Sequence, residues 1–317
     1  MSTIFEEYPI INNKLNEVKK TIDDRLTTSE IKFSKVVRSI FNENSKLIRP
    51  SLVLIASEYN ENVSEKAISL AAAVEMMHVA SLVHDDIIDN AKTRRNQPTI
   101  NEQYDIGYAV ICGDYLFSKA FEIIFESQDL KGISKMGNNV TNMVFGEVEQ
   151  YLDKYNQEIN VERYLSMIEK KTASFFATSL TLGAYLAKVK QKEIDLLELI
   201  GKNMGMLFQI QDDLLDFKSN NITGKTSNMS DLKRGIYSLP IIIAMENDLK
   251  FKEYLKSEDI NYDNIKTYLT NNKALEKCDD YIQKYYQETI KLINELSNNN
   301  VKEKLNYLVN KLLRREK

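Results

Sequence analysis

Helix-breaking residues are scarce in this chain of 317 residues. It contains 10 glycines and 4 prolines, well below the average usage of about 7% and 5%. Few breakers favour long helices, and no strong alternation of apolar and polar residues points to strands. The composition therefore predicts an all-α protein.

Cysteine and histidine are also rare. The two cysteines, Cys112 and Cys278, lie far apart and form no C-x-x-C pair, which excludes a disulfide framework and indicates a reducing compartment. With only His78 and His84 besides them, a zinc site lacks ligands. The apolar runs are shorter than the roughly 20 residues of a membrane span, and the N-terminus lacks a signal-peptide pattern. We expect a cytoplasmic protein without a transmembrane segment.

Charge is mixed rather than patterned. The 42 basic and 46 acidic side chains give a net charge of −4, without the basic stripe that follows a nucleic-acid backbone. No nucleic-acid partner is expected. Since no linker or short-period repeat interrupts the chain, we expect a single domain over residues 1–317.

Apolar residues at helical spacing are the main pattern that is present. They predict helices over residues 64–90, 108–125, 140–155, 163–187 and 195–217. The polar segments 92–99 and 218–238 are predicted to be loops.

Two acidic motifs of the form D-D-x-x-D lie near the ends of two of these helices: Asp85, Asp86 and Asp89, then Asp212, Asp213 and Asp216. Two chance occurrences have odds below about 0.01. The outer aspartates of each motif are four residues apart, so they share a helix face one turn apart.

Clustered aspartates with few His or Cys neighbours favour a hard cation. Mg²⁺ is commonly shared between one or two carboxylates and a substrate phosphate. Candidate cations for a diphosphate are Lys46, Arg49, Arg94, Arg95, Lys171 and Lys225. Taken locally, Lys46 and Arg49 also fit surface cations near a turn, and Lys171 fits a lysine that snorkels beside core. The small, apolar residues before Asp85 would suit a hydrocarbon tail, so the pattern suggests isoprenoid chemistry.

The order and spacing of these motifs over residues 44–245 resemble the trans-isoprenyl diphosphate synthases (polyprenyl synthetases). The stretch VEMMHVASLVHDDIID is similar to the catalytic components of bacterial heptaprenyl synthases, some of which need a smaller partner subunit. The resemblance implies an isoprenoid synthase type helical bundle around a deep central cavity, with both motifs facing each other at its mouth. It also implies a homodimer, or a heteromer with a small regulatory subunit.

The resemblance also implies roles for individual residues. The six aspartates would hold three Mg²⁺ ions, with Asp85, Asp89 and Asp212 as the principal ligands, and would be catalytic together with Lys171. The allylic diphosphate would be bound by Arg94, Lys171, Thr172, Gln209 and Lys225. Isopentenyl diphosphate would be bound by Lys46, Arg49, His78 and Arg95. His84 would orient the first motif or be structural.

The implied reaction is ionisation of the allylic diphosphate, condensation with isopentenyl diphosphate and elimination of a proton. In the family, a bulky aromatic residue five positions before the first aspartate limits product length. That position is Ala80 here, beside Ser81, with Met77 as a partial floor. We therefore expect a product near hexaprenyl or heptaprenyl, as for a quinone side chain.

Three positions depart from the family pattern. Asn44-Ser45-Lys46 replaces Gly-Gly-Lys, Arg94-Arg95-Asn96 replaces Arg-Arg-Gly, and Ile236 stands where short-chain members have lysine. The first two changes keep the charges, and the third resembles longer-chain members. The alternatives are a short-chain farnesyl or geranylgeranyl synthase, a subunit active only with a partner, a non-catalytic subunit, a terpene cyclase and a metal-dependent phosphohydrolase.

Overall fold

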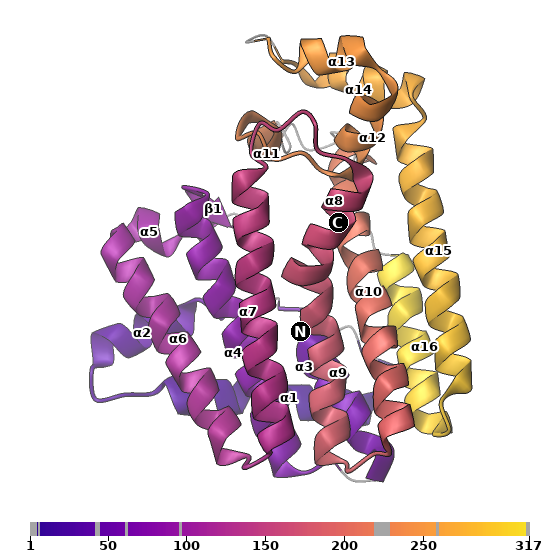
Figure 1. The fold of residues 1–317 in the computed structure, drawn as a ribbon. Coiled ribbons are helices and arrows are strands. Elements are labelled where there is room, and N and C mark those ends of the chain that lie inside the picture. The colour runs from indigo at the N-terminus through magenta and orange to yellow at the C-terminus, as the bar shows by residue number, and fades with distance from the viewer. Residues whose placement is uncertain are drawn as a thin grey trace. The chain divides into compact units, whose positions relative to one another are not determined.

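A computed structural model of the chain describes residues 5, 7–41, 45–60, 63–94, 97–218, 229–257 and 260–314. These residues are mostly helical (Figure 1), so the predicted all-α class is confirmed. The helices are α1 (Pro9–Leu26), α2 (Ile31–Ser39), α3 (Ile48–Ser57), α4 (Glu65–Ile88), α5 (Ile100–Gln103), α6 (Ile106–Glu126), α7 (Leu130–Leu152), α8 (Val161–Ile168), α9 (Ser174–Leu186), α10 (Gln191–Lys218), α11 (Met229–Lys233), α12 (Leu239–Asn247), α13 (Leu249–Tyr254), α14 (Tyr262–Asn271), α15 (Ala274–Glu295) and α16 (Asn299–Leu313). Short elements are the 3₁₀ turn η1 (Glu58–Asn60), the π-helical segment η2 (Glu169–Ala173) and the strands β1 (Thr93–Arg94) and β2 (Gln97–Pro98).

The chain divides into two compact units, each described here by itself. The first contains Met1–Lys135 and Ser179–Ile194, and the second contains Met136–Thr178 and Asp195–Lys317. The single domain over residues 1–317 and its central cavity stay predictions.

Helix α4 is the core of the first unit and packs against α1, α3 and α6. It begins at Ser64, whose side chain accepts a hydrogen bond from the Ala67 N–H, as helix-capping serines do. Apolar residues are buried on every side of it, which is typical of a helix inside a core. By length and hydropathy α4 could also cross a membrane, but 72% of its apolar window is buried within the protein. Buried core helices pass the same test, so we keep the expectation of no transmembrane segment.

Residues 92–99, predicted to be a loop, contain the two-residue strands β1 and β2. Thr93 pairs with Pro98 and Arg94 pairs with Gln97 in antiparallel register. The hydroxyl of Thr99 and the side-chain amide of Asn101 both donate to the Ala91 carbonyl, at 2.7 and 3.1 Å. These bonds fix the base of the hairpin just after the first acidic motif, so the loop prediction was wrong at these four residues.

In the second unit, α12 contacts α8, α13, α14 and α15, and α15 lies alongside α16 (Figure 1). Buried residues of α16 recur at helical spacing, with Val301, Leu305, Leu308 and Leu312 on one face. The segment 218–238 was predicted to be a loop, yet it contains the short helix α11. Its residues 219–228 lie outside the described part of the chain.

Candidate functional site

The first acidic motif ends helix α4. Asp85 lies in its last turn, and the Asp89 N–H donates to the Asp85 carbonyl at 2.9 Å, so the two outer side chains share a face one turn apart. Asn90 ends the helix with a positive φ of 49°. The C-terminal end of a helix carries a partial negative charge, so three carboxylates gathered there are an arrangement that a bound cation stabilises.

The middle aspartate of this motif points to a protein partner. Both oxygens of Asp86 accept from Arg94 Nε at 2.9 Å, and Arg94 Nη2 lies 2.8 Å from Oδ1. The Asp86 side chain is only 9% exposed, whereas that of Arg94 is 41% exposed. The hairpin therefore places Arg94 beside the first acidic motif.

The second motif lies in the last two turns of α10, with Asp212 and Asp216 again one turn apart. Its middle residue, Asp213, accepts hydrogen bonds from the Tyr164 hydroxyl at 2.7 Å, the Gln209 amide at 3.0 Å and the Leu239 N–H at 3.4 Å. Tyr164 is fully enclosed, with 1% exposure. Both motifs thus use the middle carboxylate to bind the surrounding protein.

Burial dominates the electrostatics of Asp213. It raises the pKa of this carboxyl to about 7, although the hydrogen bonds from Tyr164, Gln209 and Leu239 act to lower it. Burial also raises the pKa of Tyr164 well above its ordinary value, and the neighbouring Asp213 charge adds to that effect. The Tyr164 hydroxyl therefore stays a donor toward Asp213 at neutral pH.

Lys170, Lys171 and Thr172 lie in the π-helical segment η2, which the sequence pattern did not predict. Lys171 donates to Gln150 at 2.6 Å and pairs with Glu147. Thr172 donates to the side-chain oxygen of Gln209 at 2.9 Å. The structure thus connects three of the predicted allylic-diphosphate residues, and π-helical turns are frequent at functional sites.

Three of the four residues predicted to bind isopentenyl diphosphate are described, and they lie on α3, on α4 and in the turn before α3. Arg49 Nη1 is 3.2 Å from His78 Nε2, so the guanidinium donates to the ring. Lys46 is exposed in that turn. Leu47, which follows it, has a positive φ of 48° and precedes the helix. The hydroxyl of Ser45 donates to the buried carboxylate of Glu75 at 2.7 Å, so a departure from the family pattern fastens this turn to α4.

We expect Ser45→Ala to raise the KM for isopentenyl diphosphate by roughly three- to tenfold, since one hydrogen bond to a charged group is lost. The KM for the allylic substrate should stay within about twofold, because Ser45 anchors only the Lys46 turn. Steady-state kinetics checks both values. Ser39→Ala is the control, because among the described residues the Ser39 hydroxyl bonds to the Val36 carbonyl of its own helix alone. Equal changes in both KM values would contradict this assignment.

His84 is partly buried between α4 and α6 of the first unit. Its ring packs against Phe117 with centroids 5.6 Å apart, and Nε2 lies 3.4 Å from Asp114 Oδ1. Gly113 makes room for it, because a Cβ there would lie 2.3 Å from His84 Nε2. This packing agrees with an orienting or structural role next to Asp85.

The predicted chain-length residues lie on α4. Met77 and Ala80 are fully buried at 0% exposure. Ser81 is partly buried, and its hydroxyl donates to the His78 carbonyl at 2.8 Å. Their role in product length stays a prediction.

Several predicted residues cannot be placed. Arg95, Lys225, Asn44 and Asn96 lie outside the described residues. The two motifs belong to different units, so their meeting at one site also stays a prediction.

Among the described residues, no group of three or more His, Cys, Asp and Glu side chains could hold a metal ion. Mg²⁺ is usually bound by one or two carboxylates together with substrate phosphates, so a pair of aspartates one turn apart fits its chemistry.

Comparison with known proteins agrees with these features. A sequence profile of the polyprenyl synthetase family matches residues 30–293. Members of this family use divalent metal ions. Heptaprenyl diphosphate synthase component 2 of Bacillus subtilis (strain 168) is 32% identical over 240 residues, which cover 76% of this chain and 69% of that protein.

Solved structures extend the likeness to nearly the whole chain. Heptaprenyl diphosphate synthase from Staphylococcus aureus superposes with a TM-score of 0.87 at 27% identity, over 97% of this chain and 99% of that chain. Geranylgeranyl pyrophosphate synthase from Lactobacillus brevis ATCC 367 reaches a TM-score of 0.91 at 26% identity, over 98% and 99%. The predicted isoprenoid synthase fold is thereby confirmed. The chain belongs to the polyprenyl synthetase family of trans-isoprenyl diphosphate synthases.

Proposed function

We propose that this enzyme condenses isopentenyl diphosphate with an allylic diphosphate, farnesyl or similar, to give a medium- or long-chain all-trans polyprenyl diphosphate. The observation that carries the proposal is the repeated arrangement at the ends of α4 and α10. In each motif two aspartates share a helix face, while the middle one bonds to neighbouring protein donors. Relatives named for heptaprenyl diphosphate support the longer product.

We propose three Mg²⁺ ions per site, with Asp85, Asp89 and Asp212 as principal ligands. Such ions, once bound, would neutralise the departing diphosphate. The chain adds fixed cations and donors to the same task. Arg94, Lys171, Thr172, Gln209 and Lys225 would orient the allylic diphosphate, and their charges would favour the developing negative charge of the leaving group.

The second substrate would be held by Lys46, Arg49, His78 and Arg95. Arg49 donates to His78 Nε2, and His78 would donate to a phosphate oxygen of this substrate. Once the allylic C–O bond breaks, the double bond of isopentenyl diphosphate attacks the cation. The proton then lost can pass to the departed diphosphate, so no side-chain base is required.

The test is incorporation of labelled isopentenyl diphosphate by the purified chain with farnesyl diphosphate and Mg²⁺, followed by measurement of product length. A polyprenyl diphosphate longer than geranylgeranyl supports the proposal. Products that stop at geranylgeranyl would contradict the longer chain. Consumption of farnesyl diphosphate without isopentenyl incorporation would instead indicate a terpene cyclase.

Product length should respond to Ala80→Phe. Because Ala80 is fully buried, a phenylalanine there would fill the space that a growing chain needs. We expect the main product to become shorter, with a stability cost of about 1–3 kcal/mol from overpacking. Chromatography of dephosphorylated products measures the length, and thermal melting measures the cost. An unchanged product would remove Ala80 from the chain-length pocket.

We also propose that the enzyme works in the cytoplasm as a homodimer or as a heteromer with a small regulatory subunit. The name "component 2" of the B. subtilis relative supports a heteromer. The chain alone, assayed at increasing concentration, distinguishes the two. Complete inactivity that a second gene product rescues would indicate the heteromer.

A further inference from the structure

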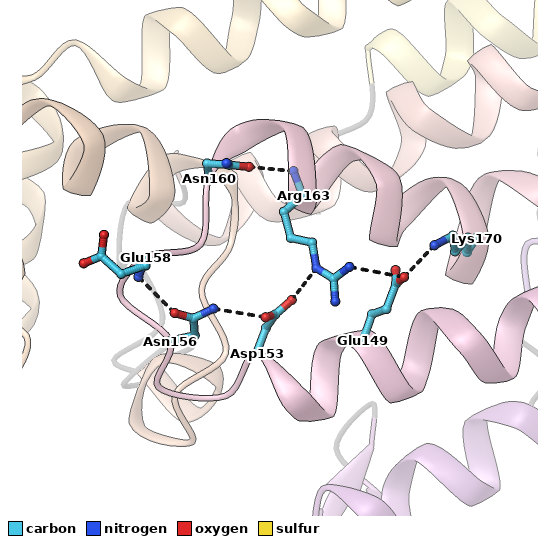
Figure 2. A network of polar contacts seen from close by, with 7 residues as sticks. All are labelled: Glu149, Asp153, Asn156, Glu158, Asn160, Arg163 and Lys170. Carbon is cyan, nitrogen blue, oxygen red and sulfur yellow. Dashed lines mark hydrogen bonds and ion pairs between the residues drawn. The ribbon is translucent and has the colours of Figure 1, made fainter.

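A polar network fastens the C-terminal end of α7 to the beginning of α8 (Figure 2). Arg163 is its central residue. Arg163 Nε donates to Asp153 at 2.9 Å, and Nη1 donates to Glu149 Oε1 at 3.3 Å. Lys170 donates to the same Glu149 oxygen at 2.5 Å. Two asparagines between α7 and α8 extend the network: Asn156 donates to Asp153, and Asn160 accepts from the Arg163 N–H.

The network balances two carboxylates with two cations. Glu149 and Asp153 are largely enclosed, with side chains 16% and 14% exposed, whereas Arg163 is 41% exposed. Glu149 receives both cations on Oε1, and its Oε2 is buried without a hydrogen-bond partner among the described residues. Removing one partner of an enclosed ion pair is costly, so Arg163 and Lys170 help to fix this carboxylate in place.

Glu149 also lies beside η2, which contains two of the predicted allylic-diphosphate residues, Lys171 and Thr172. Lys170 and Lys171 are consecutive in η2, and both bind α7: Lys170 at Glu149, Lys171 at Gln150 and Glu147. The backbones touch at Gly146, where a Cβ would lie 2.7 Å from the Lys171 N atom. A shift of Glu149 would therefore reach Lys171 through Lys170 and through α7.

Helix α8 is also connected to Thr172 of η2, through a series of hydrogen bonds that passes by the second acidic motif. Tyr164, next to Arg163, donates to Asp213. Asp213 in turn accepts from Gln209, which accepts from Thr172. Arg163 and Tyr164 thus connect the π-helical segment to α7 on one side and to the second acidic motif on the other.

We propose that Arg163 is a positioning residue for the allylic diphosphate grip at Lys171 and Thr172. This inference rests on the proposed function, which assigns the diphosphate to these two residues. Arg163 neutralises Glu149, so the carboxylate neither repels the diphosphate nor draws the η2 lysines out of place. Without Arg163, Lys170 is the one cation that remains to Glu149 in this network.

The test is equilibrium binding by titration calorimetry in the presence of Mg²⁺. The probes are farnesyl thiodiphosphate, an unreactive allylic analogue, and isopentenyl diphosphate alone. We expect Arg163→Gln to weaken farnesyl thiodiphosphate binding about tenfold, as for loss of one partner of an enclosed ion pair. Its isopentenyl diphosphate Kd should stay within about twofold. Adding Glu149→Gln should restore the analogue Kd to within about threefold of wild type, because it returns the network to equal numbers of carboxylates and cations.

The matched control is Arg38→Gln. Arg38 is 40% exposed and also makes a two-pronged pair, with Asp23, but it lies in α2. Melting temperatures show which variants are folded, and Arg163→Met, which removes the charge but keeps most of the side-chain length, replaces Arg163→Gln if that variant does not fold. Arg163→Lys keeps the charge and should bind the analogue to within about threefold of wild type. Equal weakening of both ligands, no weakening, or a double variant worse than the single one would overturn the inference. Failure of the wild-type chain to bind either diphosphate would instead count against the proposed function.

Discussion

Asparagine at Asp85 or at Asp212 should lower kcat/KM by about 10³-fold, the typical cost of removing one group that stabilises transition-state charge. Asparagine at Asp86 or Asp213 should lower it by less than about tenfold. The reason is the division of labour within each motif. Asp86 bonds to Arg94, and Asp213 bonds to Tyr164, Gln209 and Leu239. Asp85 and Asp212 are the proposed Mg²⁺ ligands.

The Mg²⁺ concentration for half-maximal activity separates these roles. It should rise at least about tenfold in Asp85→Asn and Asp212→Asn, because a ligand is lost. In Asp86→Asn and Asp213→Asn it should stay near the wild-type value. Those two variants should instead melt earlier, since each replaces a carboxyl oxygen that accepts hydrogen bonds from the protein, a loss of about 1–3 kcal/mol. A metal requirement that rises as much for Asp86→Asn as for Asp85→Asn would make the middle carboxylate a ligand.

The sequence predicted the features that depend on local pattern. Apolar spacing located α4 and α10, because a buried helix face repeats every three to four residues. The same spacing placed both D-D-x-x-D motifs at helix ends and put their outer aspartates on one face. Clustered carboxylates without nearby sulfur or imidazole indicated a hard cation, and the motif order led to the correct family.

Features that depend on distant partners could not be predicted in this way. Tyr164 is 49 residues from Asp213, and nothing in the sequence around Tyr164 marks its hydroxyl as the donor to a motif aspartate. The π-helical segment Glu169–Ala173 also escaped prediction, because EKKTA fits an ordinary α-helix and one wider turn hardly disturbs the apolar period. The strands β1 and β2 have two residues each, too few to show a period of two.

The backbones of α7 and η2 lie in close contact, so a substitution at this contact should lower both the stability of the protein and its affinity for the allylic diphosphate. Gly146 of α7 faces Lys171. A Cβ added at Gly146 would lie 2.7 Å from the Lys171 backbone N, 2.8 Å from the Lys171 Cβ and 2.9 Å from the Lys171 Cα. Two of these atoms belong to the backbone and cannot rotate away. We expect Gly146→Ala to destabilise the protein by about 1–3 kcal/mol, as overpacking does, and to weaken farnesyl thiodiphosphate binding by more than about tenfold, because Lys171 is displaced.

Gly137 is the matched control, nine positions earlier in the same helix. A Cβ there meets nothing within 4 Å, so Gly137→Ala should stabilise the protein by about 0.5–1 kcal/mol through helix propensity alone. Urea unfolding measures the change in the free energy of unfolding for each variant. If the contact at Lys171 decides the outcome, Gly146→Ala lowers this free energy and Gly137→Ala raises it. Two stabilised variants would mean that α7 and η2 separate easily, and the tight placement of Lys171 would then have to be abandoned.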